Sequence, residues 1–320
     1  MKKGVKIWLI VAVALVGAGL LLFVSVMAVN RWDFTKLGTG KYETNTYELH
    51  EEFSNISIKT DTADIVFAPS EDGVCRVICY EEEKAKHFAT VQDETLSIQV
   101  HSTKKWYDHI VISSGSPKIT VYLPQNDYAA IKIEESTGKV NIPKDFQFES
   151  IDISTSTGAV TNYASAANTV KIKTTTGIIR VEHVSVGALD LSVSTGNVTV
   201  SGVICEGEVK VGVSTGKTKL TDVSCKSVTS NGSTGDILLK NVIASERVSI
   251  ERDTGDVRFE GSDAAEIFVK TDTGDVSGSL LTDKVFITET DTGHIRVPSS
   301  VSGGRCEITT DTGDIEISIG

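Results

Sequence analysis

Apolar and polar residues alternate along most of this chain, and from residue 131 onward the alternation recurs every 19 or 20 residues. A Thr-Gly pair marks each of ten repeats. The residue seven positions before the glycine is apolar in all ten, and the residue two positions after it is apolar in nine, with Thr218 as the exception. The ten glycines are Gly138, Gly158, Gly177, Gly196, Gly216, Gly235, Gly255, Gly274, Gly293 and Gly313.

Each repeat therefore contains two short strands of period two, each with one apolar face, joined at a Thr-Gly corner. Glycine supplies the backbone freedom that a sharp bend needs. A single coil cannot bury its own apolar face, so coils must stack with parallel, in-register pairing. The pattern predicts an all-β fold, a single-stranded parallel β-solenoid (β-helix) of about ten 19–20-residue coils over residues 131–320. At ~4.8 Å per strand the rod would be about 48 Å long.

Residues 48–130 carry the same pattern in a degraded form. In NISIKTDTADIVFAP, Ala63 takes the glycine place, and CRVICYE, TLSIQV and KITVYLP are further candidate strands. The four inward positions hold Ile56, Ile58, Ile65 and Phe67. We expect irregular coils and an N-terminal cap here, because a solenoid needs an atypical unit over its first edge. At the other end we expect an open edge at Gly320, to which another chain could add.

The N-terminal segment has a different pattern. Residues 7–29 contain no charge, and as a helix they are long enough to cross the ~30 Å hydrocarbon core of a membrane. Lys2, Lys3 and Lys6 precede this run, so the positive-inside rule predicts cytoplasmic residues 1–6, a transmembrane signal anchor and an extracytoplasmic remainder at the cell membrane. Polar residues 30–47 are predicted to be a juxtamembrane linker. A signal peptide cleaved after Ala28 is the alternative, and it exports the remainder as well.

Charge narrows the choice of partners. Residues 1–36 hold five of the 31 basic residues and one of the 43 acidic residues, which leaves residues 37–320 with a net charge of −16. Nucleic-acid binding needs a basic footprint. The sequence therefore predicts a membrane contact through the helix and no nucleic-acid partner.

Taken together, the Thr-Gly repeats, the segment ISIKTDTADIVFAP and the segment ITVYLP resemble the bacterial DUF4097 family of adhesin-like proteins. The resemblance covers roughly residues 48–320. Its motif is a repeat and not a catalytic signature, so it implies an envelope-exposed β-helix without an established reaction.

Four corners read Asp-Thr-Gly, the tripeptide that carries the catalytic carboxylate of aspartic proteases. Such a protease needs two of these loops face to face, with two carboxylates sharing one proton. Here the four copies recur at the repeat period, and the earlier corners hold Ser or Thr in the same place. An aspartate that alternates with serine is a turn residue whose side-chain oxygen accepts backbone N–H groups. The sequence predicts no protease and no enzyme.

The same corners predict an acidic ridge. Stacked carboxylates ~4.8 Å apart repel by about 0.9 kcal/mol in water and about 3.5 kcal/mol at an effective dielectric of ~20. Backbone hydrogen bonds with solvent exposure are one way to offset this repulsion, and Ca²⁺, which prefers oxygen ligands, is the other. Only His294 among the histidines lies in this column. The candidate calcium ligands are Asp253, Asp256, Asp272, Asp275, Asp291, Asp311 and Asp314; no other cofactor is predicted.

The cysteines and histidines indicate no catalytic site. Cys205 and Cys225 each follow a corner glycine by nine residues, so stacking brings their Cα atoms to about 5 Å, as unbonded neighbours or as a disulfide. Cys75 and Cys79 lie on one face of a strand, too far apart to bond. The six histidines show no metal-ligand spacing.

The predicted function follows from the predicted cellular location and shape of the protein. The sequence favours a membrane-anchored rod that acts by recognition, as an adhesin or scaffold of the bacterial envelope, with an envelope protein or a glycan as partner. One alternative is an accessory protein of an envelope-stress response, docking on a partner in the same membrane. A polysaccharide-acting β-helix enzyme is less favoured, because the acidic ridge lies on a convex corner. Trp106 and Tyr107 either stack on a carbohydrate or pack within the cap.

Overall fold

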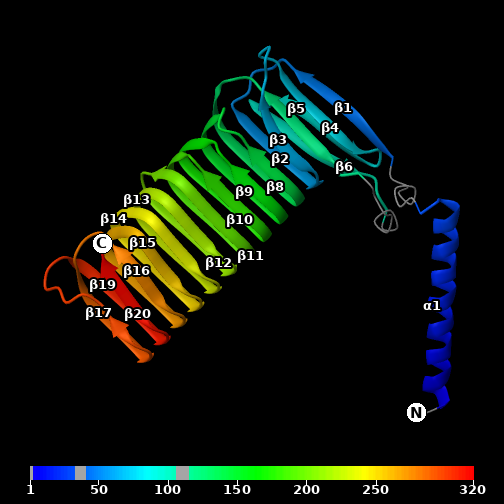
Figure 1. Ribbon diagram of the computed structural model, residues 1–320. Coiled ribbons are helices and arrows are strands. Elements are labelled where there is room, and N and C mark those ends of the chain that lie inside the picture. The colour runs from blue at the N-terminus through cyan, green and yellow to red at the C-terminus, as the bar shows by residue number, and fades with distance from the viewer. Residues whose placement is uncertain (1–2, 33–40, 106–114) are drawn as a thin grey trace.

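The computed structural model of the chain describes residues 3–32, 41–105 and 115–320. In these residues, one helix precedes twenty strands that wind into a rod (Figure 1). The N-terminal helix is α1 (Lys3–Val29). Trp106 and Tyr107 lie outside the described residues.

Helix α1 is apolar and exposed along nearly its whole length. Its span from Gly4 to Val29 has a mean hydropathy of 2.8 and is long enough to cross a membrane. The helix ends where the Trp32 N–H donates to Met27 O, with Arg31 and Trp32 both at positive φ. The predicted apolar helix is confirmed.

The regular part of the rod consists of parallel strands paired in register. Corner glycines are direct partners across coils: Gly138 pairs with Gly158, and Gly158 with Gly177. Strands β8 to β11 run through the corner without a break, whereas later coils break there into two strands. The strands are β8 (Asp127–Ile142), β9 (Gln147–Asn162), β10 (Ser165–Glu182), β11 (Ser185–Cys205), β12 (Glu208–Thr215), β13 (Thr218–Thr234), β14 (Ile237–Thr254), β15 (Val257–Thr273), β16 (Val276–Leu280), β17 (Lys284–Thr292), β18 (Ile295–Arg296), β19 (Gly304–Thr312) and β20 (Ile315–Ile319).

Aliphatic side chains fill the interior in stacked rows, of which two serve as examples. Ile131 lies on Ile151 in one row and Val140 on Val160 in the other, and none of the four is more than 1% exposed. One hydrophobic cluster continues from the cap to the last coils. The predicted parallel β-solenoid of about ten coils is confirmed.

Close backbone approach explains the glycine at each corner. Gly177 has φ of 155°, and a Cβ added there would lie 1.7 Å from the carbonyl oxygen of Gly158 in the coil below. At Gly235, with φ of 128°, the same atom would lie 2.0 Å from Gly216 O. No other residue fits, because any side chain would enter the backbone of the neighbouring coil.

The last two coils do not stack in chain order (Figure 1). β19 pairs with β15 on one side and β17 on the other, and β20 lies in the same way between β16 and β18. The coil of Gly313 is therefore inserted between the coils of Gly274 and Gly293. The expectation of an open edge at Gly320 is wrong, since β20 is paired on both sides and the Gly320 N–H donates to Leu280 O. The open edge belongs to β17 and β18.

Two local features favour this stacking, in which the coil of Gly313 lies between those of Gly274 and Gly293. Lys284, at the start of β17, is buried, and its Nζ lies 2.6 Å from Asp263 Oδ1 in β15. Gly304 of the inserted coil is the register partner of Lys284, and a Cβ there would lie 1.9 Å from the carbonyl oxygen of Ala265 in β15. Pro298 follows β18 and has no N–H to donate, which suits an edge and not the middle of a sheet.

Seven strands close the opposite end of the rod as a cap. β2 pairs in parallel with β6 and β8, and β3 with β7 and β8. Antiparallel strands then extend both sheets. In one sheet β4 pairs with β7 and β1 pairs with β4; in the other, β5 pairs with β6. Ala63, 1% exposed, takes the glycine place between β2 and β3. The strands are β1 (Tyr42–Leu49), β2 (Asn55–Thr62), β3 (Asp64–Pro69), β4 (Cys75–Glu82), β5 (Ala85–Gln92), β6 (Thr95–Ser102) and β7 (Lys118–Leu123).

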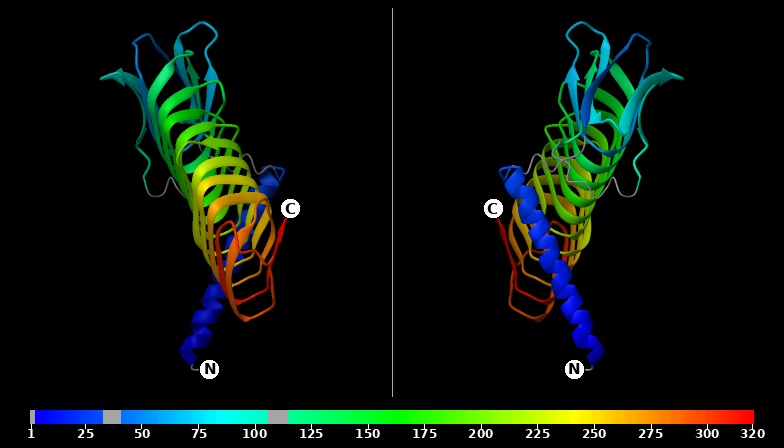
Figure 2. Two further views of the ribbon diagram at one scale, coloured as in Figure 1. Left: turned by 90° about the vertical axis from the view of Figure 1, so that its left-hand side faces the viewer. Right: turned by 90° about the vertical axis from the view of Figure 1, so that its right-hand side faces the viewer.

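The prediction that residues 30–47 form a linker is wrong for residues 42–47, which belong to β1. This strand pairs with β4 over its whole length, from Tyr42 opposite Glu82 to Leu49 opposite Cys75. Its polar sequence concealed it, because an edge strand exposes one face to solvent. Figure 2 shows β1 and the cap strands extending the two sheets of the rod beyond the first regular coil.

Candidate functional site

The acidic ridge lies on the outside of the rod, along the Thr-Gly corners. All seven predicted ligands are exposed. In stacking order, the position two residues before the glycine holds Asp253, Asp272, Asp311 and Asp291, and the position after the glycine holds Asp236, Asp256, Asp275, Asp314 and His294.

The aspartates that follow the glycines form a ladder with the backbone. Asp256 Oδ1 accepts the backbone N–H of Asp275 at 2.9 Å, and Asp275 Oδ1 accepts that of Asp314 at 2.8 Å. Asp314 Oδ1 then accepts the N–H of His294 at 2.7 Å. Each carboxylate thus satisfies a donor of the next coil, which offsets part of the repulsion along the column.

The same contact occurs outside the acidic coils wherever the residue after the glycine has a side-chain carbonyl or carboxylate. Asn197 Oδ1 accepts the N–H of Lys217, and Asp64 Oδ1 accepts that of Lys139, both at 2.9 Å. Ala159 occupies this position in another coil and has no side-chain acceptor. Its register partner in the following coil, Ile178, pairs with it through regular backbone register only. The ladder is therefore a structural device of the corner, independent of any ligand.

Neighbouring groups stabilise both ends of the ladder. The Lys217 ammonium lies 3.0 Å from Asp236 Oδ2, and this contact lowers the pKa of Asp236. At the far end, the backbone N–H and then the ring of His294 lower the pKa of Asp314. Both carboxylates are held in the ionised form.

Calcium binding by the ridge stays a prediction. In the part of the chain that the structure describes, one group of three acidic, His or Cys side chains brings its ligand atoms within 4.8 Å of one another, and it lies elsewhere, in the cap. A cation on the ridge would therefore be held by pairs of exposed carboxylates with solvent completing its shell.

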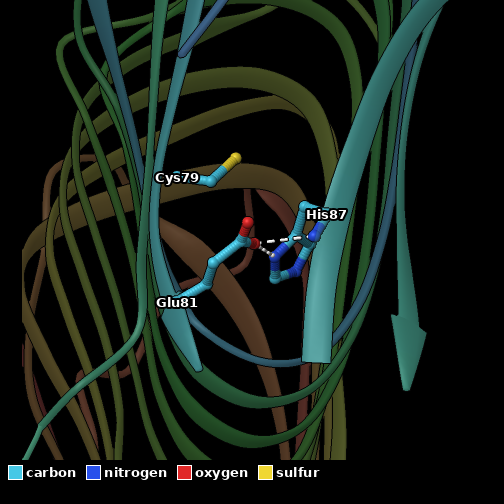
Figure 3. Close-up of side chains that lie close together, drawn as sticks. All are labelled: Cys79, Glu81 and His87. Atoms are coloured by element: carbon cyan, nitrogen blue, oxygen red, sulfur yellow. Dashed lines mark hydrogen bonds and ion pairs between the residues drawn. The ribbon is translucent and has the colours of Figure 1, made fainter. Parts of the chain in front are cut away.

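The cap group consists of Cys79, Glu81 and His87, all buried (Figure 3). Cys79 and Glu81 project inward from β4, and His87 projects inward from β5 in the facing sheet. Glu81 Oε2 lies 2.6 Å from His87 Nδ1 and also accepts the His87 backbone N–H at 2.6 Å. These groups form a compact polar site in an otherwise aliphatic interior.

Strands β1 and β2 complete the surroundings of this group. Asn45 Nδ2 donates to Glu81 Oε1 at 2.7 Å, and Tyr47 OH donates to His87 O at 2.6 Å. Thr60 Oγ1 lies 2.7 Å from His87 Nε2. Burial, with a smaller contribution from Glu81, raises the pKa of the Cys79 thiol to about 12. Four strands therefore meet at one hydrogen-bonded centre.

Sequence reasoning missed this group. Cys79 and Glu81 are two residues apart, which places them on one face of a strand. His87 joins them only because β4 and β5 lie in opposite sheets that face each other, and no residue spacing shows that. The sequence did carry one signal: Glu81 stands on the inward face of a strand whose other inward residues are apolar.

The five cysteines are all buried free thiols. Cys205 and Cys225 lie close enough for the first to affect the pKa of the second, although burial is the main cause of its rise to about 12. Cys205 Sγ donates weakly to the carbonyls of Gly187 and Glu208. Neither thiol has the accessibility or the lowered pKa of a reactive cysteine.

Fold and site together define a class: a capped parallel β-solenoid behind an apolar helix, with an acidic outer corner. The chain belongs to the DUF4097 family, named Toastrack, whose model matches residues 53–212 and 204–320. The resemblance seen in the repeats is thus confirmed.

Two solved structures show the same fold. One, from Parabacteroides distasonis, is described as a "putative lipid binding protein"; it is 14% identical, with a TM-score of 0.51, over 88% of this chain and 98% of its own. The other, from Parabacteroides merdae, is described as a "putative adhesin"; it is 13% identical, with a TM-score of 0.51, over 77% of this chain and 98% of its own. Among curated proteins the comparison finds no match.

Proposed function

We propose that the protein is a membrane-anchored interaction protein of the bacterial envelope, an adhesin or scaffold whose solenoid lies outside the cytoplasmic membrane. Its N-terminus is cytoplasmic and α1 is the anchor. The partner is an envelope protein or a glycan, and the protein acts by binding and not by catalysis. The Toastrack fold and the adhesin-like description of one structural relative support this proposal.

The observation that carries the proposal is the difference between the two ends of the rod. Beyond the first regular coil, the cap covers the sheets. At the other end, Ile295 is 45% exposed at a position where Val276 and Ile315 are completely buried. On the outward face of β17, Ile287 adds a further apolar side chain that is 49% exposed. An unpaired strand edge with exposed apolar side chains is a surface to which an extended segment of a partner can add.

Site-specific photo-crosslinking in intact cells tests this proposal. A photoreactive amino acid replaces Ile287 at the open end, and Lys171, at the equivalent exposed position of a middle coil, is the control. We expect position 287 to capture a discrete partner and position 171 to capture none. Equal capture at both positions, or none at either, would contradict binding at the open end.

The identity of the captured molecule separates the two interaction hypotheses. A partner from the same membrane favours an accessory role in an envelope-stress response, and a partner from another surface or the cell wall favours adhesion. Labelling of cysteines introduced before and after α1 tests the orientation. A label that reaches residues after α1 only in permeabilised cells would rule out the extracytoplasmic solenoid.

A further inference from the structure

The cap group of Cys79, Glu81 and His87 has features that its hydrogen bonds alone do not require. Its three members offer a sulfur, an oxygen and a nitrogen within 4.8 Å of one another. The side chains of Glu81 and His87 are 1% and 3% exposed. Ionisable groups this deeply buried are found where they are paired or where they coordinate a metal.

We propose that this group is a structural zinc site, in which Cys79 Sγ, a Glu81 carboxylate oxygen and His87 Nδ1 bind one Zn²⁺ ion. Zinc accepts mixed sulfur, nitrogen and oxygen donors in tetrahedral geometry, with bonds of about 2.0–2.3 Å. Calcium and magnesium prefer oxygen ligands only, so a thiol and an imidazole exclude them here.

The hydrogen bonds around the group already orient two of these ligands. Zinc-bound histidines commonly donate their second ring N–H to a neighbouring acceptor. Thr60 Oγ1, 2.7 Å from Nε2, is placed to accept that N–H when Nδ1 binds the metal. Asn45 holds Glu81 Oε1 in the same manner, which leaves Oε2 on the side of His87.

Charge also balances in the occupied site. A Cys79 thiolate, a Glu81 carboxylate and a neutral His87 imidazole around one Zn²⁺ ion sum to zero net charge, so the burial cost of an unpaired charge does not arise.

The required movement is small. Ligand atoms of a tetrahedral zinc ion lie roughly 3.3–3.6 Å apart. Glu81 Oε2 and His87 Nδ1, now 2.6 Å apart, must separate by less than about 1 Å, and the sulfur must approach from at most 4.8 Å. Rotation of side chains on fixed strands is sufficient, with water as the fourth ligand.

Metal titration of the full chain in detergent, after treatment with a chelator, tests the site with Zn²⁺ and with Co²⁺ as a spectroscopic substitute. We expect one metal ion per chain and a thiolate-to-cobalt charge-transfer band. At zinc concentrations a hundredfold above Kd, the melting midpoint should rise by about 5 °C or more. Absence of bound metal, or metal bound without the thiolate band, would overturn the proposal.

Cys75 provides a matched control for Cys79. Both are buried on the inward face of β4, at 2% and 0% exposure, but Cys75 lies outside the group. Cys79→Ser should lose the charge-transfer band and at least tenfold in zinc affinity, whereas Cys75→Ser should keep both. A band that persists in Cys79→Ser, or that disappears in Cys75→Ser, would show that the metal binds elsewhere.

Discussion

At the scale of single residues, one buried arginine accounts for several departures from the repeat. Arg252 is 1% exposed and occupies the inner side of a corner. Its guanidinium donates to Val213 O at 2.8 Å, to Thr218 Oγ1 at 3.1 Å and to Ser230 Oγ at 3.3 Å. Thr218, the one polar residue at its repeat position, is therefore an acceptor for the arginine. Burial lowers the pKa of Arg252.

Gly232 makes room for this side chain. A Cβ at Gly232 would lie 1.6 Å from Arg252 Nη1 and 1.8 Å from Val213 O. Gly232→Ala should therefore lower the free energy of unfolding by about 3 kcal/mol, because the arginine would lose its place in the core. Gly212→Ala is the control, since a Cβ there meets nothing closer than 3.9 Å. Urea unfolding followed by circular dichroism measures both, and equal midpoints would refute this account.

The carboxylate ladder gives a second prediction at this scale. Asp275→Ala leaves the Asp314 N–H without its acceptor and should cost about 1 kcal/mol of stability. Asp275→Asn should restore most of the loss, as the amide of Asn197 shows at another corner. Asp272→Ala, at an exposed position outside the ladder, should have little effect. Thermal melts of the three variants against the parent chain compare these effects.

Glu135 makes stability depend on pH. It lies on the inner side of the first corner, 6% exposed, and neither carboxylate oxygen has a hydrogen-bond partner among the described residues. Burial, and to a smaller extent Asp64, raises its pKa to about 7 from 4.5. The folded state therefore favours the protonated acid, so its contribution is fully present below pH 4.5 and is lost as pH rises through 7. Glu135→Gln should flatten this dependence and be more stable than the parent above pH 7, as melts across pH 4–8 would show.

At the scale of elements, the exchange of order in the last coils depends on the buried ion pair of Lys284 and Asp263. Lys284→Met leaves the Asp263 carboxylate without its cation and should cost about 3–5 kcal/mol. The exposed pair of Arg296 and Glu316, in the same coils, provides the control, and Arg296→Met should change stability little. Hydrogen exchange of the backbone amides of residues 284–296 measures the local loss of stability. Unchanged protection in Lys284→Met would show that the pair does not hold the coil in place.

Periodicity predicted most of these elements but not their order. Apolar residues at fixed distances from each glycine determine which side chains face inward, and stacking follows from them. The changed stacking order of the last two coils does not alter this spacing, because Gly313 follows Gly293 by 20 residues, as in coils that stack in chain order. Pro298 and the Gly303-Gly304 pair were the local signals. The zinc ligands were also hidden, since they meet only across two facing sheets.

At the scale of the whole molecule, charge is distributed unevenly around the rod. Along one outer column, opposite charges face each other from coil to coil, in the series Lys132, Asp152, Lys171, Asp190 and Lys210. The corner has no such alternation in its last coils and carries a row of acids. The rod thus has one electrostatically distinct edge, which extends to its open end.

The calcium prediction concerns this edge. If the ridge binds Ca²⁺, millimolar calcium should raise the melting midpoint of the full chain, and the double variant Asp253→Asn with Asp272→Asn should abolish the increase. Magnesium serves as the comparison, because it tolerates the irregular geometry of exposed carboxylate pairs less well. A midpoint that calcium leaves unchanged removes the prediction.

The inserted coil has a consequence for how the protein is made. During synthesis, coils up to β16 can add to the growing rod one after another, each on the coil that precedes it in the chain. Residues 284–296 break this sequence, since the strands they pair with, β19 and β20, are synthesised after them. Completion of the rod thus waits for β19 and β20. A chain that ends prematurely after residue 300 lacks both inserted strands and has no native partner for the coil before them.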